Sequence, residues 1–252
     1  METKIFDIKL PTSWAELTDK QLLMVFKLFS RDLSSAEVKT LCLMKWNRLR
    51  VLASLPRHRF LIKRGKEQVV LSTRQVQQAT SVLDFLDSFA PMPVRISRIG
   101  KYRALPADFE KVPFEQYLYV DNLFQGYLNT QQEQLLLQMA QVLYASDHVK
   151  PTKVHLVGIF YWMASLKQYF ASLFSNFYKP APAKGEDNLL GSGQPDIYSQ
   201  LRDSTNAMIR ALTGGDITKE AAIMKMDTWR ALTELDAKAR EVEEFRKATK
   251  KP

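Results

Sequence analysis

The side chains of this sequence with the clearest chemical potential are basic. Thirteen Lys and Arg residues but only three acidic residues lie between Lys45 and Arg103, so this segment carries +10 while the whole chain of 252 residues carries +9. Such a concentration of positive charge attracts nucleic acid or an acidic protein surface. The candidate polyanion-binding residues are Arg57, Arg59, Lys63, Arg64, Lys66, Arg95, Arg98, Lys101 and Arg103.

Three interpretations of this basic segment stay open at this stage. The charges could converge on one face that binds nucleic acid, they could face an acidic protein, or they could be scattered over a solvated surface. None of the RNP, zinc-finger or helix-turn-helix patterns occurs in the segment. Its charge therefore predicts attraction to an anionic partner but does not indicate which kind of partner.

Residues that could support catalysis or bind a metal are sparse. The three histidines are His58, His148 and His155, and no Cys, Asp or Glu completes a metal-ligand spacing around them. Cys42 lies in an apolar helical pattern, which is typical of a buried, inert thiol. Neither a Gly-x-Ser-x-Gly motif nor a phosphate-binding glycine loop is present. We therefore expect no enzyme activity, no catalytic residue, no metal and no cofactor.

A second candidate site lies near the C-terminus. Leu232, Leu235, Ala239 and Val242 are spaced by three, four and three residues, and charged residues occupy the positions between them. This pattern predicts an amphipathic helix with a narrow apolar seam, which could pack on its own domain or dock onto another subunit. The candidate partner-binding residues are Trp229, Leu232, Leu235, Val242 and Phe245.

The elements that must position these residues are mostly helices. Only nine glycines occur in the chain, whereas sheet proteins use glycine freely in tight turns. Capping boxes at Thr18–Gln21, Ser72–Gln75 and Thr130–Glu133 predict helix starts, and another helix is expected from Ser34 or Ser35 to about Arg50. Short β-rich runs predict one hairpin near 59–71, and a long helix is expected from Thr152 to about Tyr178.

The predicted fold is mainly α. It consists of a multi-helix domain over residues 1–178 with the small β-hairpin near 59–71, a linker over 179–195, and a short helical C-terminal unit over 196–252. The linker prediction rests on the prolines and glycines concentrated in 180–195.

Composition also predicts the compartment. The only cysteine is Cys42, so the chain forms no internal disulfide, and its first residues lack the basic and apolar regions of a signal peptide. The most apolar stretch, Val154 to Ala164, has eleven residues, while a membrane-spanning helix needs about twenty. We expect a cytoplasmic protein without membrane contact.

Three passages resemble proteins of the tail-assembly modules of tailed phages and prophages, including tail assembly chaperones. They are residues 10–18 (LPTSWAELT), 113–118 (PFEQYL) and 227–235 (DTWRALTEL). The resemblance implies a non-catalytic helical assembly factor or structural component, whose partners are other protein subunits. It also implies a location in the host cytoplasm or within a virion or tail-like particle. The alternative is a nucleic-acid-binding accessory protein that uses the basic residues of 45–103.

Overall fold

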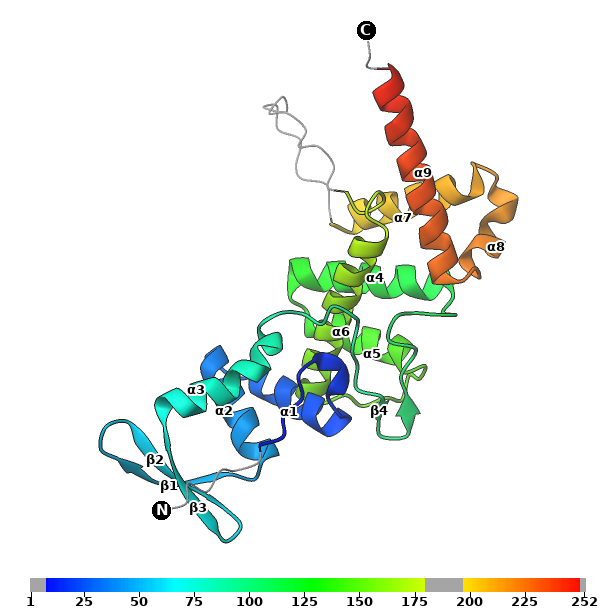
Figure 1. The fold of residues 1–252 in the computed structure, drawn as a ribbon. Coiled ribbons are helices and arrows are strands. Elements are labelled where there is room, and N and C mark those ends of the chain that lie inside the picture. The colour runs from blue at the N-terminus through cyan, green and yellow to red at the C-terminus, as the bar shows by residue number, and fades with distance from the viewer. Residues whose placement is uncertain (1–7, 180–196, 250–252) are drawn as a thin grey trace, which may run out of the picture. The chain divides into compact units, whose positions relative to one another are not determined.

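The computed structural model of the chain describes residues 8–179 and 197–249. The fold is mainly α, as predicted, with two small antiparallel sheets among the described residues. The chain divides into two compact units (Figure 1). Unit 1 comprises residues 1–90, 94–97 and 152–161, and unit 2 comprises 91–93, 98–151 and 162–252.

The helices of unit 1 begin where local sequence signals place them. A 3-10 turn, η1 (Trp14–Glu16), precedes α1 (Asp19–Phe29) and α2 (Ser35–Trp46), and α3 (Thr73–Thr80) continues into the 3-10 helix η2 (Ser81–Asp87). Thr18, Ser34 and Ser72 each form a complete capping box with the residue three positions later. The predicted boxes at Thr18 and Ser72 are therefore confirmed, because each satisfies two backbone donors at a helix start.

Unit 1 contains a three-stranded antiparallel sheet in the order β1 (Arg50–Leu55), β2 (Arg59–Arg64) and β3 (Glu67–Ser72). The predicted hairpin corresponds to β2 and β3, but the strand before it was missed. The helix expected to reach Arg50 ends at Trp46, and Arg48 has a left-handed backbone with φ of 54°. That conformation is incompatible with a continuing helix, so the chain turns into β1 instead.

The core of unit 1 packs around aromatic rings from η1, α1 and the first part of α6 (Lys153–Leu173). Phe26 and Val25 are fully buried, and the indole Nε1 of Trp14 donates to the carbonyl oxygen of Phe85 at 2.9 Å. Tyr161 of α6 contacts the rings of Trp14, Phe26 and Phe29. The first part of the long helix predicted from Thr152 is thus a core element of this unit.

Unit 2 consists mainly of helices. Its described elements are β4 (Arg98–Ile99), β5 (Tyr102–Arg103), α4 (Phe114–Thr130), α5 (Glu133–Leu143), the last part of α6, α7 (Ile197–Thr213), η3 (Ile217–Lys219), α8 (Glu220–Met224) and α9 (Thr228–Thr249). The predicted capping box at Thr130 is wrong, because Thr130 is the last residue of α4 and its hydroxyl donates to the carbonyl of Gly126.

The C-terminal helices belong to the same compact unit as residues 98–151, so the compact units follow different boundaries from those predicted at 178 and 196. The predicted linker lies outside the described residues except for Lys179. Thr228 at the start of α9 donates through both its backbone nitrogen and its hydroxyl to the carbonyl of Val112, at 2.9 and 2.7 Å. The indole Nε1 of Trp229 donates to the carbonyl of Asp108 at 2.8 Å. These bonds anchor α9 in the body of unit 2.

None of the helices in residues 8–179 and 197–249 combines the length and the apolar character needed to cross a membrane.

Candidate partner-binding groove

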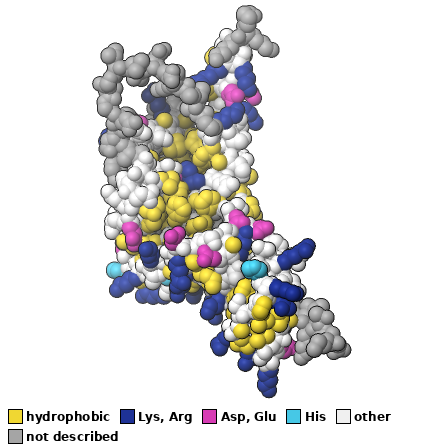
Figure 2. Space-filling model, turned by 90° about the vertical axis from the view of Figure 1, so that its left-hand side faces the viewer, with side chains coloured by type: hydrophobic (Ala, Val, Ile, Leu, Met, Phe, Trp, Pro, Cys, Tyr) yellow, Lys and Arg dark blue, Asp and Glu magenta, His cyan; other side chains and the backbone are white. Residues whose placement is uncertain are grey.

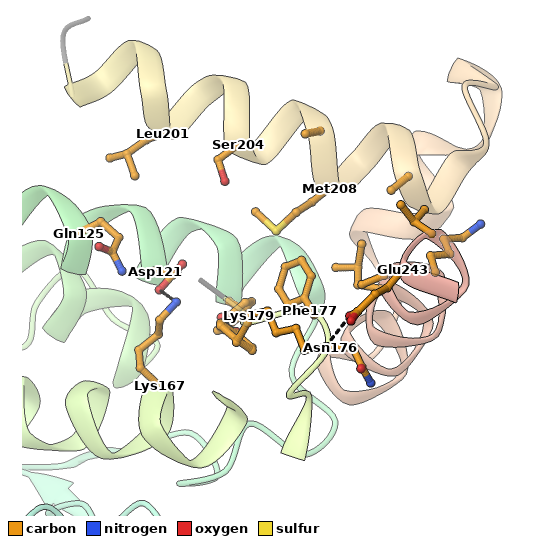
Figure 3. A pocket seen from close by; sticks show the side chains of 18 of the residues that line it. Asp121, Gln125, Lys167, Asn176, Phe177, Lys179, Leu201, Ser204, Met208 and Glu243 are labelled. Atoms are coloured by element: carbon orange, nitrogen blue, oxygen red, sulfur yellow. Dashed lines mark hydrogen bonds and ion pairs between the residues drawn. The ribbon is translucent and has the colours of Figure 1, made fainter. Parts of the chain in front are cut away.

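A large groove of about 1200 Å³ lies within unit 2 (Figure 3). Its walls come from α4, from α7, from α9 and from the end of α6 with the turn that follows it. These four segments are far apart in the sequence, so only tertiary packing assembles the groove. Its volume exceeds the range of about 300–1000 Å³ typical of small-molecule pockets, and it is open to solvent.

The walls of this groove are largely apolar. Met208 on α7 and Phe177 after α6 lie toward the same space in Figure 3, and Leu201 extends the apolar surface along α7. Val242 on α9 also lines the groove and is 52% exposed. Because flexible methionine side chains adapt to differently shaped partners, Met208 suits a protein-docking surface.

Charged residues also line the groove. Among the described lining residues are five basic side chains (Lys167, Lys179, Lys238, Arg246 and Lys247) and two acidic ones (Asp121 and Glu243). Lys167 pairs with Asp121 at 2.8 Å, and Glu243 pairs with both Lys179 and Lys247. Hydrogen bonds from Lys179, the larger effect, and from Lys247 lower the pKa of Glu243, so this carboxylate stays ionised. The charge of the described lining residues is therefore net positive.

Two tyrosines on the wall of the groove form a hydrogen-bonded pair. Their hydroxyl oxygens, on Tyr117 of α4 and Tyr178 after α6, are 2.5 Å apart. Burial raises the pKa of both phenols well above the ordinary value of about 10. Both therefore stay neutral near pH 7, which suits a structural contact better than acid–base chemistry.

The predicted apolar stripe of α9 is buried in its first part and exposed in its last part. Leu232 and Leu235 are buried, with 0% and 3% of their surfaces exposed, and Trp229 packs against Phe170 and Phe174. Val242 and Phe245 are 52% and 70% exposed. The first part of the stripe is therefore core of unit 2, with Leu235 also bordering the groove, and the two exposed candidate partner-binding residues are Val242 and Phe245.

Asp236 connects α9 to the turn after α6 within unit 2. Its carboxylate accepts hydrogen bonds from the backbone nitrogens of Asn176 and Phe177, at 2.8 and 3.0 Å, and from the side-chain Nδ2 of Asn176, at 2.9 Å. Burial alone would raise the pKa of Asp236, but these hydrogen bonds and the charge of Arg240 together lower it. The ionised carboxylate therefore holds the wall of the groove that carries Phe177.

We expect Asp236→Asn to lower the free energy of unfolding by about 1–3 kcal/mol at pH 7, because it weakens hydrogen bonds to a charged acceptor. The native pKa is below the unfolded value near 3.9, so this stabilisation is complete above about pH 4 and is lost as pH falls through the native pKa. Urea unfolding of both proteins between pH 7 and pH 2.5 should show the difference shrinking toward acid. A constant difference across this range would contradict the role assigned to the charge.

The structure places the nine predicted polyanion-binding residues in separate groups. Arg57, Arg59, Lys63, Arg64 and Lys66 belong to β2 and its two turns in unit 1. Arg95 is half-buried in the same unit. Arg98, Lys101 and Arg103 lie on the β4–β5 hairpin of unit 2, where Arg98 pairs with Arg103 across the two strands. Among the described residues, only the five basic residues of β2 and its turns form a large group on one sheet.

The side chains of the described residues that could act as a nucleophile or bind a metal are not grouped together. Cys42 is fully buried, and burial raises the pKa of its thiol to about 12, so it stays protonated. The Nδ1 of His155 accepts a hydrogen bond from the backbone nitrogen of Thr152 at 3.0 Å, next to the start of α6. Within the part of the chain that the structure describes, no cluster of three or more His, Cys, Asp or Glu residues could hold a metal.

Sequence reasoning identified Leu235 and Val242 on the α9 wall but missed the walls that come from α4, α6 and α7. Tyr117 and Met208 follow ordinary helical periodicity, and such a pattern is the same whether a side chain faces a core or an open groove. Comparison with protein-family models, with curated proteins and with solved structures finds no significant match for this chain.

Proposed function

We propose that this chain is a non-catalytic protein-interaction protein, an assembly factor or structural component of a phage-tail-like assembly. The observation that carries the proposal is the open apolar groove of unit 2, which continues onto the exposed Val242 of α9. The resemblance of the three short passages to tail-assembly proteins supports the kind of assembly.

The groove suits an amphipathic helix of another subunit. An amphipathic helix places apolar side chains at every third or fourth position into such a groove, and the walls here offer Met208, Leu201 and Val242 to receive them. The net positive charge of the described lining residues favours acidic residues on the partner's polar face. The proposed partner is therefore an acidic amphipathic helix.

Binding of two labelled peptides of about twenty residues, which span roughly 30 Å as helices, tests the proposal. Both carry the same leucine stripe, and the polar face is glutamate-rich in one and lysine-rich in the other. Fluorescence anisotropy with the full chain should show the acidic peptide binding about tenfold more tightly. Val242→Asp should weaken that complex by at least about tenfold, and Phe245→Asp should weaken it less, because Phe245 lies outside the groove lining.

Thr233→Asp is the matched control, since it adds the same charge to an exposed position of α9 that does not line the groove. It should leave peptide binding unchanged. The proposal fails if neither peptide binds, if the basic peptide binds as tightly as the acidic one, or if Thr233→Asp and Val242→Asp have equal effects.

A further inference from the structure

The sheet of unit 1 has one face in the core and one face toward solvent. Phe60 and Ile62 of β2 pack on Leu43 and Leu49, and Ile62 is 2% exposed. Side chains alternate between the faces along a strand, so Arg59, Leu61 and Lys63 lie on the opposite, outer face. The core therefore uses one side of β2 and leaves Arg59 and Lys63 on the other.

The strand pairing identifies the neighbours of these residues. Lys63 pairs with Arg50 of β1 and with Gln68 of β3, while Leu61 pairs with Ala53 and Val70. Directly paired residues share a face, so the outer face has an apolar centre of Leu61 and Val70 with basic side chains around it. Figure 2 shows hydrophobic side chains ringed by Lys and Arg at the lower end of the view, where the sheet lies.

The charge of this face is strongly one-sided. Residues 50–72 contain six Lys and Arg residues and a single acid, Glu67. Glu67 pairs in register with Arg64, which alternation places on the inner face with Ile62, and the two form an ion pair at 3.7 Å. Among the strand residues, the outer face therefore has no acidic side chain to balance Arg50, Arg59 and Lys63.

The turn between β1 and β2 adds a strained basic residue. Arg57 and His58 both have left-handed backbones, with φ of 62° and 53°, where hairpin turns favour Asn and Gly. Strain of this kind is often retained at ligand-binding positions. Arg57 is exposed, so it adds positive charge at the β1–β2 end of the sheet.

From this arrangement we propose that the outer face of the β1–β2–β3 sheet binds duplex nucleic acid. Arg50, Arg57, Arg59, Lys63 and Lys66 contact backbone phosphates, and Leu61 and Val70 lie against the groove between them. Three strands spaced about 4.8 Å apart span about 10 Å, which fits the major groove of about 12 Å. The proposal concerns unit 1 and is independent of the groove in unit 2.

Two observations favour a duplex over other anionic partners. The described outer face has no aromatic side chain, since Phe60 faces the core, whereas single-stranded nucleic acid is usually bound by base stacking. An acidic peptide could add as a strand at an edge of the sheet, and β1, one of the two edge strands, carries a register irregularity between Val51 and Ala53. Such bulges discourage strand addition at an edge.

Salt-dependent binding of the full chain to a labelled 20-base-pair DNA duplex, measured by fluorescence anisotropy, tests the proposal. Neutralising about five phosphates should weaken binding about 500-fold between 50 and 200 mM salt, a logarithmic slope of about −4.5. The double variant Arg59→Ala/Lys63→Ala should bind more weakly and have a slope shallower by about two. The double variant Lys27→Ala/Arg31→Ala removes the same charge from exposed positions elsewhere in unit 1 and should behave like the unaltered chain.

Three results would overturn the proposal. No binding at 50 mM salt would show that this face does not bind DNA. Equal affinity for a single strand would show that it does not recognise a duplex. Displacement of the duplex by polyglutamate at matched charge would assign the face to an acidic protein instead. Val242→Asp should leave duplex binding unchanged, so failure here is distinguishable from failure of the proposed helix-docking function.

Discussion

Replacing Trp162 by alanine is expected to lower the free energy of unfolding of unit 2 by about 4 kcal/mol. Trp162 is 1% exposed, and its ring contacts Phe109 and Tyr144 edge to face. Its indole Nε1 donates to the carbonyl oxygen of Ala107 at 2.7 Å. The variant therefore creates a large cavity and also removes the indole donor from a backbone acceptor, and both effects destabilise the same unit.

Trp162→Phe separates the two effects. Phenylalanine keeps most of the buried ring but lacks the indole donor, so we expect a loss of about 1–2 kcal/mol. Urea unfolding should measure both losses, and hydrogen exchange should locate them in peptides of 98–151 and 162–179. Equal losses for the two variants would show that the hydrogen bond, not ring volume, dominates.

Gly158 is the second position where a small change should have a large effect. A Cβ at this position of α6 would lie 2.9 Å from the Cδ2 of Phe26 and 3.1 Å from the Cδ1 of Ile96. The Phe26 ring is fully buried and packs against Trp14 and Tyr161, so it has little room to move. We expect Gly158→Ala to destabilise unit 1 by about 2 kcal/mol and Gly158→Val by about 3 kcal/mol, although alanine favours helices.

Gly126 on α4 provides the matched control. A Cβ there would meet only the Cδ1 of Leu135, at 3.2 Å, which is the end of a flexible side chain. Gly126→Ala should therefore change stability by less than about 1 kcal/mol, because the helix-propensity gain offsets a small adjustment. Thermal unfolding of the two alanine variants compares them directly. Equal effects would mean that the contact with Phe26 relaxes without cost.

Local residues determine where a helix starts. Which face of a sheet or which half of a helix is buried depends instead on tertiary packing. The apolar and basic residues of β2 were visible in the sequence, but the outer face of the strand became defined only when Phe60 and Ile62 packed on Leu43 and Leu49. The same applies to α9, whose apolar stripe is continuous in sequence but is buried at Leu232 and exposed at Phe245. The stripe predicted the helix, and packing decided which half of it faces solvent.

Local sequence patterns predicted the mainly helical fold, the helix starts at Thr18, at Ser34 or Ser35 and at Ser72, the β2–β3 hairpin and the buried state of Cys42. Each depends on a few neighbouring residues, through a cap, a turn or an apolar period. Tertiary structure alone decided the strand β1, the two compact units and the groove. The groove unites Tyr117, Phe177, Met208 and Val242. Contacts between residues so far apart depend on how whole helices pack, because many different packings satisfy the same local periodicity.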